Sequence, residues 1–270
     1  MNGHIRYIAI NAERPDVLAR FYTIHLGLRE LGRSAGGDVS LTDGWVNLSL
    51  LKWQPGAEEP RGLSHYGVAI DDIRELEARL EEFAPRADIQ QDKGGVHHGE
   101  YRVLDPNGFP VSVSTRAFGT GGPVNDRARI RHVAMRQPNN DAVLDFVSGV
   151  FGFREIRSSL AQREKGMPHR FAGDGIINLA ILSNQPVKEG PKSRPLTEQQ
   201  LEHGWVCHFG FVMPNMLAMM AGLPEESGRA AAGEGLTMVE YEILDPEHNC
   251  MDFSQNRGFE VDRDVWERAA

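Results

Sequence analysis

An internal duplication constrains the fold of this chain more than any other feature of the sequence. Residues 7–30 align with residues 132–155 without a gap, at a constant offset of 125 residues. Three later segments recur in the same order: VNLSLL (46–51) as INLAIL (177–182), HYGVAI (65–70) as HFGFVM (208–213), and YRVLDPNG (101–108) as YEILDPEH (241–248). The offset grows to 143 residues and settles at 140, so the insertions fall in loops while the elements persist. The repeat predicts two copies of one structural unit.

Each half has the same order of elements. A short apolar strand leads to a helix that starts near Pro15 or Asn140, which are residues typical of a first helical turn or an N-cap. Three strands follow, and then a further strand, a second helix that is clearest at 72–83, and strands around an Asp-Pro turn. We therefore expect an α+β fold with two tandem domains, at 1–118 and 128–258, each with its own core. The Gly-rich, polar segment 117–129 is the expected linker between them.

Alternating residues in four strands of the second half define two faces of a sheet. Successive side chains of a strand point to opposite sides. Met251 and Phe253 therefore oppose Asp252, while Cys207, Phe209 and Phe211 share the face opposite His208. If helices cover the bulky apolar face, a curved sheet collects the other face into a cup. The residues expected inside this cup are His132, His208, Asp252, Asn178 and Cys250.

Three of these cup residues predict a metal site. His132, His208 and Asp252 lie at points where the first half carries Tyr7, His65 and Ser112. Two histidines and one carboxylate suit a divalent transition metal, and a buried carboxylate is costly to ionise unless a cation accompanies it. We therefore expect one metal site, in the second half, and interpret His65 as a hydrogen-bonded core histidine.

The overall composition excludes several partners. The net charge is −9 and the acidic residues are scattered, which disfavours nucleic acid and anionic lipid. No apolar run approaches the roughly 20 residues that a membrane span needs. The first residues do not read as a signal peptide, and the two cysteines provide no disulfide framework. We expect a cytoplasmic protein, with a homo-oligomer as one possibility, whose partner is a small-molecule substrate.

Over nearly the whole chain this pattern resembles the vicinal oxygen chelate superfamily, which includes glyoxalase I, type I extradiol dioxygenases and bleomycin-resistance proteins. The resemblance implies βαβββ modules that pair into cup-shaped mixed sheets with helices on the convex face. Four modules with a metal in the second pair are most similar to extradiol dioxygenases, in which two His and one Glu hold Fe(II). The matching residues here are His132, His208 and Asp252. The implied metal is Fe(II), with Mn, Zn or Co as alternatives, and the implied substrate is catecholic or dicarbonyl and chelates the metal through two adjacent oxygens.

Three departures from the extradiol pattern keep other reactions open. The carboxylate ligand is Asp rather than Glu, the acid–base His of those enzymes is replaced by Ile177 and Asn178, and their Tyr is replaced by Glu242. The candidate catalytic residues are Glu242 as a base, His169 as a substitute acid or base, and Asn178. An extradiol-type dioxygenase is the leading interpretation. The alternatives are a glyoxalase-, epimerase- or hydrolase-like metalloenzyme and a metal-free, resistance-type binding protein.

Two further segments have expected roles. Residues 184–204 have no counterpart of similar length in the first half, and insertions of this kind often form lids or binding loops. The C-terminal tail 256–270 is expected to end in a short helix.

Overall fold

The computed structural model describes all residues except 93–96, 185–195, 224–228, 232–238, 256–258 and 262–270. In the described part of the chain, no helix is both long enough and apolar enough to cross a membrane. The insertion at 184–204, which was expected to form a lid, lies mostly outside the described residues. Most of the tail at 256–270, for which a helix was expected, also lies outside them.

Sixteen strands and six α-helices make up the described structure, in the same order in both halves apart from α4 and α5. The first half contains β1 (His4–Ala12), α1 (Pro15–Leu26), β2 (Arg29–Arg33), β3 (Val39–Thr42), β4 (Asn47–Lys52), β5 (Gly62–Ala69), α2 (Ile73–Phe83), β6 (Ile89–Gln91), β7 (Tyr101–Leu104), β8 (Pro110–Ser114) and the 3₁₀ turn η1 (Ala117–Gly119). The second half contains β9 (Arg129–Gln137), α3 (Asn140–Phe151), β10 (Arg154–Glu155), α4 (Arg157–Glu164), β11 (Arg170–Gly173), β12 (Asn178–Ser183), α5 (Glu198–His203), β13 (Trp205–Val212), α6 (Met216–Gly222), β14 (Arg229–Ala231), β15 (Tyr241–Leu244) and β16 (Cys250–Ser254).

The two halves form two eight-stranded sheets with one topology. The first has the order β2-β3-β4-β1-β5-β8-β7-β6 and the second has the order β10-β11-β12-β9-β13-β16-β15-β14. In each sheet the first strands of two modules pair antiparallel at the centre, as β1 with β5 and β9 with β13. Each of these central strands pairs in parallel with the last strand of its own module. The expected α+β fold, with two βαβββ modules in each mixed sheet, is confirmed.

The helices that follow β1 and β9 end on a glycine that the duplication preserves. Gly27 and Gly152 have φ angles of +74° and +77°, in the left-handed region that a side chain disfavours. The amide of each glycine bonds a carbonyl of the last helical turn. This cap explains why the glycine of LGLRE in the first half recurs in FGFRE in the second.

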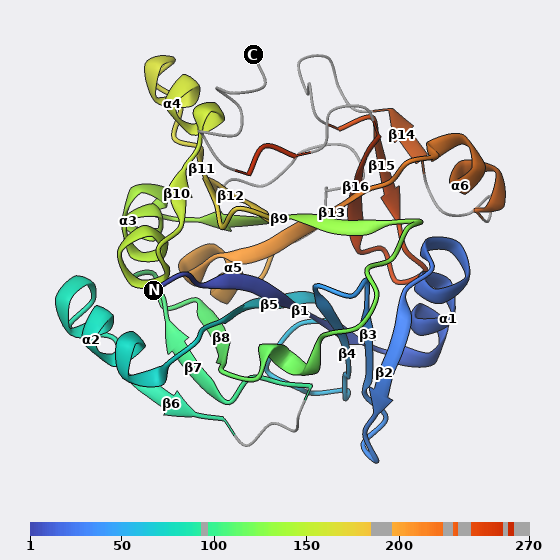
Figure 1. Cartoon of the computed structure of the whole chain (residues 1–270), viewed down its shortest axis with the longest axis horizontal. Helices are drawn as coiled ribbons and strands as arrows, with labels where there is room; N and C mark the ends of the chain where they lie inside the picture. Colours follow the sequence, from blue (N-terminus) through green and yellow to red (C-terminus); the bar gives the residue numbers. More distant parts are fainter. Residues whose placement is uncertain (93–96, 185–195, 224–228, 232–238, 256–258, 262–270) are drawn as a thin grey trace.

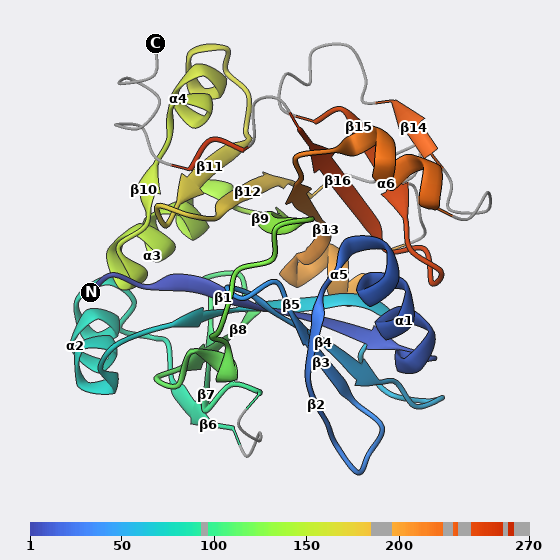
Figure 2. The ribbon, with the colours of Figure 1, turned by 45° about the vertical axis from the view of Figure 1, so that its right-hand side comes forward.

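The apolar faces of the two sheets meet in one continuous core, so the expectation of a separate core for each domain is wrong. Ile8 and Tyr66 of the first sheet belong to the same buried cluster as Val133 and Phe209 of the second. Figures 1 and 2 show the sheets stacked on each other, with α2 beside α3 at one end and α1 beside α6 at the other. The helices and the opposite sheet together cover each convex face, and the two concave faces point away from each other. The physical reason is that two apolar sheet faces can cover one another and so remove each other's apolar surface from water.

Two buried aspartates at matching points clasp the halves together. Asp43 accepts hydrogen bonds from the amides of Trp45 and Val46 in its own turn, and one from Ile130 N (2.8 Å) in the other half. Asp174 accepts from Ile176 N and Ile177 N, and from Ile5 N (2.6 Å) across the boundary. The first residues of β1 and β9 are thus each held by the opposite half, which fixes where both central strands begin.

Candidate metal centre

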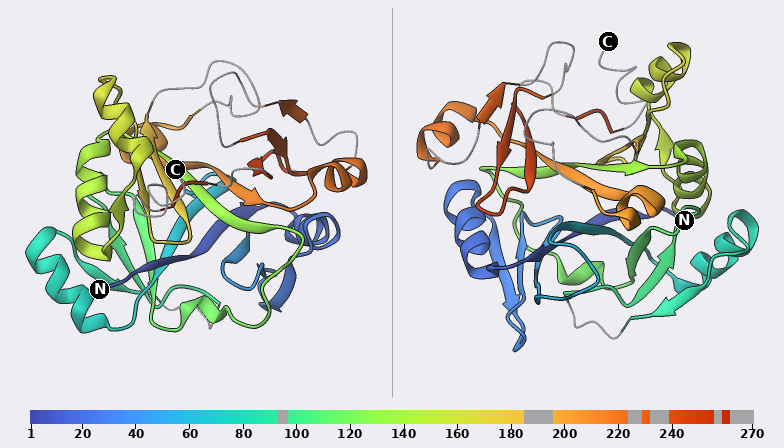
Figure 3. Two further views of the ribbon diagram at one scale, coloured as in Figure 1. Left: turned by 45° about the horizontal axis from the view of Figure 1, so that its top comes forward. Right: turned by 180° about the vertical axis from the view of Figure 1, so that it is seen from behind.

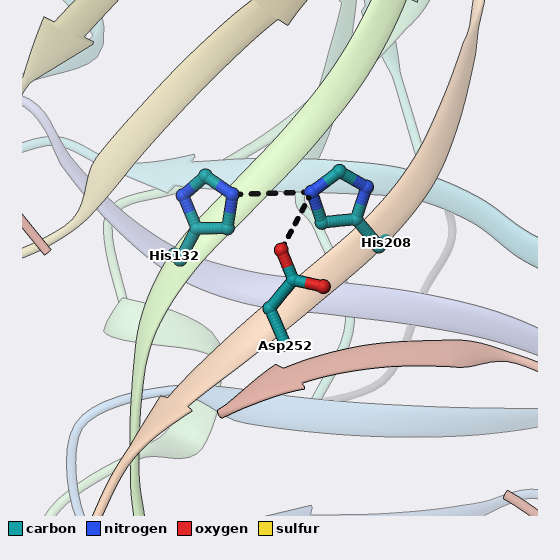
Figure 4. A group of neighbouring side chains, drawn as sticks. All are labelled: His132, His208 and Asp252. Atoms are coloured by element: carbon teal, nitrogen blue, oxygen red, sulfur yellow. Dashed lines mark hydrogen bonds and ion pairs between the residues drawn. The ribbon is translucent and has the colours of Figure 1, made fainter. Parts of the chain in front are cut away.

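The three predicted ligands come together on the concave face of the second sheet. His132 lies on β9, His208 on β13 and Asp252 on β16, which are three adjacent strands. Gly210 pairs with His132 on one side and with Asp252 on the other, so both ligands lie level with a residue that has no side chain. Figure 4 shows the three side chains converging on one point. Within the described residues, this trio is the one group of His, Cys, Asp and Glu that is close enough to hold a metal ion.

A β-bulge places Cys207 on the cup side, so the prediction that it shares a face with Phe209 is wrong. Val206 pairs with Met135 and His208 with Ala134, which leaves Cys207 as an extra residue between two ladder positions. Its side chain packs with Ala134, Ala180 and Trp205. Its sulfur lies 3.1 Å from Nδ1 of His208 and 3.4 Å from the carbonyl oxygen of Ala134. The bulge therefore gives His208 a neighbour that strict alternation of side chains does not predict.

The distances between donor atoms match those around one divalent ion. His132 Nε2 lies 3.3 Å from His208 Nε2, which lies 3.1 Å from Asp252 Oδ2, and all three ligand atoms fall within 4.8 Å of one another. With metal–ligand bonds of about 2.1 Å, donors at right angles are about 3.0 Å apart and donors at the tetrahedral angle about 3.4 Å apart. The site thus needs little adjustment to place all three atoms on one ion.

Hydrogen bonds to the other ring nitrogens turn both Nε2 lone pairs toward this point. The amide nitrogen of Asn178 donates to the backbone carbonyl of Glu260, so Asn178 Oδ1 faces His132 Nδ1 at 2.7 Å and accepts a hydrogen bond from it. When the Cys207 thiol donates to Ala134 O, its sulfur accepts from His208 Nδ1. Two imidazole lone pairs and a carboxylate then converge on a buried point, which calls for a cation. The chemistry of this donor set fits a divalent metal.

The matching residues of the first half pack as a plug. Tyr7 stacks on Phe118, with 4.7 Å between ring centroids, and its hydroxyl lies 3.3 Å from Nδ1 of His98. His65 is buried, and its Nδ1 lies 2.9 Å from the hydroxyl of Ser64. Burial, together with the positive charge of Arg102, lowers the pKa of His65 to about 3. Its hydrogen bond and burial agree with the interpretation of His65 as a core histidine.

The three candidate catalytic residues lie in different places. Glu242 pairs with Asp252 across the β15–β16 ladder, so its half-buried side chain shares the concave face with the ligands. Asn178 touches His132 directly. His169 precedes β11 at the far end of β12, where its Nδ1 accepts from Ser183 N. Asn178 is in register with His132 and Ser183 with Gln137, five residues further along, so His169 lies roughly 16 Å along the sheet from the ligands.

Sequence reasoning missed the segment that closes the cup. The ring of Phe259 stacks on that of His132, with 4.6 Å between centroids and 5° between planes. The signal was present in the duplication, since a Phe follows the last strand of each half, as Phe118 after Ser114 and as Phe259 after Ser254. Nothing in the local sequence indicates that either ring turns back into its cup.

Comparisons with known proteins identify the fold through structure rather than sequence. No family model matches the sequence, and no curated protein matches it. The Mn(II)-bound glyoxalase from Novosphingobium aromaticivorans superposes with a TM-score of 0.65 at 17% identity, covering 96% of this chain and 84% of that one. The 2,3-dioxygenase LapB from Pseudomonas sp. KL28 gives 0.61 at 14%, covering 97% of both chains. A variant of homoprotocatechuate 2,3-dioxygenase from B. fuscum gives 0.61 at 15%, covering 94% and 71%. The chain therefore shares the fold of these glyoxalase and dioxygenase structures, with the four βαβββ modules that its sequence predicts.

Proposed function

We propose that this protein is a metal-dependent enzyme whose small-molecule substrate chelates the metal through two adjacent oxygen atoms. The observation that carries the proposal is the convergence of two imidazole nitrogens and one carboxylate oxygen on a buried point of the concave face. The two nitrogens lie 3.3 Å apart, and the carboxylate oxygen lies 3.1 Å from the nitrogen of His208. A metal held by two His and one carboxylate keeps open positions, where it supplies Lewis-acid chemistry and, as Fe(II), a site for oxygen.

The residues around this point have separable tasks. His132, His208 and Asp252 would hold the ion, while Asn178 and Cys207 orient the two rings. All three ligand side chains are at most 6% exposed, so the protein wall excludes water from their side of the ion. Glu242 shares the face of Asp252, which supports the proposal that its carboxylate takes a proton from a bound substrate.

Ring-opening oxidation of a catechol by an extradiol-type dioxygenase is the leading reaction, with Fe(II) as its metal. Two arguments support it. The fold has four modules and, among the described residues, one group of candidate metal ligands, which is the arrangement expected for an extradiol dioxygenase. A halotolerant catechol dioxygenase, BphC, also shares the fold, with a TM-score of 0.58 at 14% identity.

A glyoxalase-like proton transfer is the second candidate, and the position of Glu242 favours it. This side chain lies opposite Asp252. His169, the other residue expected to act as an acid or base, lies at the far end of β12. A proton-transfer enzyme needs a base beside the metal and needs no oxygen. The Mn(II)-bound glyoxalase of the same fold is consistent with this alternative.

Metal analysis and oxygen uptake test the proposal in two steps. Protein loaded anaerobically with Fe(II) or Mn(II) should bind one equivalent by mass spectrometry, and the variant Asp252→Ala should bind much less. Failure of the wild-type protein to bind either ion would overturn the metalloenzyme proposal and favour a metal-free binding protein. Oxygen uptake with a panel of catechols under Fe(II) supports the dioxygenase. Deuterium exchange into an α-hydroxyketone or a hemithioacetal, abolished in Glu242→Gln, supports proton transfer instead.

A further inference from the structure

The residues that follow β16 form the wall of the metal centre. Phe259, Glu260 and Val261, here called the closing segment, run across the concave face beside β11 and β12 (Figures 1 and 3). The Phe259 ring lies flat on His132 and over Gly210, where an added Cβ would come within 2.6 Å of Phe259 Cζ. The carbonyl of Val261 abuts Gly173 so closely that no side chain fits there. The segment is therefore packed into the cup at several points.

Glu260 anchors this segment at both its side chain and its backbone. Its side chain is only 7% exposed, and its carboxylate accepts from Arg157 N (2.7 Å) and Ser158 N (3.0 Å), the first two residues of α4. A carboxylate at this position also complements the positive end of the helix. The backbone carbonyl of Glu260 accepts from the side-chain amide of Asn178. One chain of hydrogen bonds thus runs from α4 through Glu260 and Asn178 to Nδ1 of His132.

The first half contains part of the same chain of hydrogen bonds, but a tyrosine rather than a histidine lies at the matching position. Phe118 stacks on Tyr7, and its carbonyl accepts from the amide of Asn47 at 2.9 Å. Asn47 occupies the position of Asn178, in register with Tyr7 as Asn178 is with His132. The second half adds the carboxylate anchor, because the residue after Phe118 is Gly119. The same stacked aromatic ring and asparagine therefore pack against a tyrosine in the first half and against a candidate metal ligand in the second.

We propose that Glu260 and Asn178 are positioning residues that fix His132 in the tautomer that binds metal. The inference rests on the proposed function. An asparagine amide presents an oxygen on one side and an NH₂ group on the other, and a rotation of 180° exchanges them. The Glu260 carbonyl holds the NH₂ group, so the oxygen faces His132 and its Nδ1 must carry the proton. Nε2 then offers its lone pair to the ion. Without this constraint the amide can turn, donate to Nδ1 and leave the proton on Nε2.

Leucine at position 178 tests the proposal against a matched control in the first half. Asn178→Leu keeps the side-chain volume and removes both hydrogen bonds, while Asn47→Leu makes the same change where no ligand depends on it. Loss of such support for a ligand commonly weakens metal affinity by about 10–100-fold. We expect this loss for Mn(II) in Asn178→Leu, and an affinity within about 3-fold of wild type in Asn47→Leu. Asn178→Asp keeps the acceptor for Nδ1 and should retain most of the affinity.

A second readout needs no metal. Nitrogen-15 NMR of the metal-free protein should show His132 protonated at Nδ1 in the wild type and in Asn178→Asp. The two tautomers should be mixed in Asn178→Leu and, to a smaller extent, in Glu260→Gln. An unchanged tautomer and an unchanged affinity in Asn178→Leu overturn the inference, and so does an equal loss of affinity in Asn47→Leu. If the wild type binds no metal, the proposed function fails, but the NMR measurement still decides whether Asn178 sets the tautomer.

Discussion

His208 and His65 occupy the same point of the two halves, so replacing each by glutamine separates metal binding from packing. Both residues are buried, at 4% and 6% exposure. The Nδ1 of each contacts the side chain of the preceding residue, Cys207 at 3.1 Å and Ser64 at 2.9 Å. The two substitutions therefore disturb similar surroundings. In addition, His208 has an acidic partner and a second imidazole at its Nε2.

The size of the expected effect follows from mass action. Metal present at 100 times its dissociation constant stabilises the folded protein by about 2.7 kcal/mol. For a chain of this size each kcal/mol moves the melting temperature by roughly 2 °C, so the expected rise is about 5 °C. Removing one of three ligands should weaken binding by at least about 100-fold. The same metal concentration then equals the new dissociation constant, and the stabilisation falls to about 0.4 kcal/mol, or less than 1 °C.

Thermal unfolding with and without Mn(II) or Fe(II), paired with metal analysis of the same samples, measures this difference. The wild type and His65→Gln should gain about 5 °C and carry one equivalent of metal. His208→Gln should gain less than 1 °C and carry little. Equal gains in both variants would refute the assignment of the ligands to the second half, and loss of the gain in His65→Gln alone would place the site in the first.

Three other predictions concern acid sensitivity, the contact between the halves and the space above the ligands. Because the folded-state pKa of His65 is about 3 and the unfolded value is about 6.5, protonation favours unfolding as the pH falls through this window. At pH 5 this costs about 2 kcal/mol relative to pH 7.5, so urea denaturation should show His65→Phe losing about that much less than wild type on acidification; an identical pH dependence would contradict the reasoning. Asp174→Ala removes the acceptor of three backbone amides, including Ile5 N across the boundary, and should lower the free energy of unfolding by about 3 kcal/mol or more. A loss below about 1 kcal/mol in urea would show that the clasp matters little. Gly210→Ala would bring a methyl group within 2.6 Å of Phe259 and 2.9 Å of His132, and should weaken Mn(II) binding at least about 10-fold by titration. Gly67→Ala meets Phe118 at the same 2.6 Å and should leave binding unchanged, so a matching loss there would point to a general packing effect.

The sequence alone was sufficient to predict the repeated modules and to put the three candidate ligands on one face of the second sheet, because both depend on short-range periodicity. Alternation along each strand sets the side on which His132 and Asp252 lie, whatever the rest of the chain does. The duplication then supplied the comparison with Tyr7 and Ser112, which indicated that the second half differs chemically from the first.

Tertiary structure decided what depends on contacts between distant segments. The bulge at Cys207 arises from the pairing of β13 with β9, so alternation within β13 could not reveal it. The shared core depends on how the two sheets pack, and so do the hydrogen bonds that Asp43 and Asp174 accept from the opposite half. The return of Phe259 over His132 joins residues 127 positions apart, from 132 to 259. A contact of this kind leaves no local pattern, because its free energy comes from surfaces that meet only after the chain has folded.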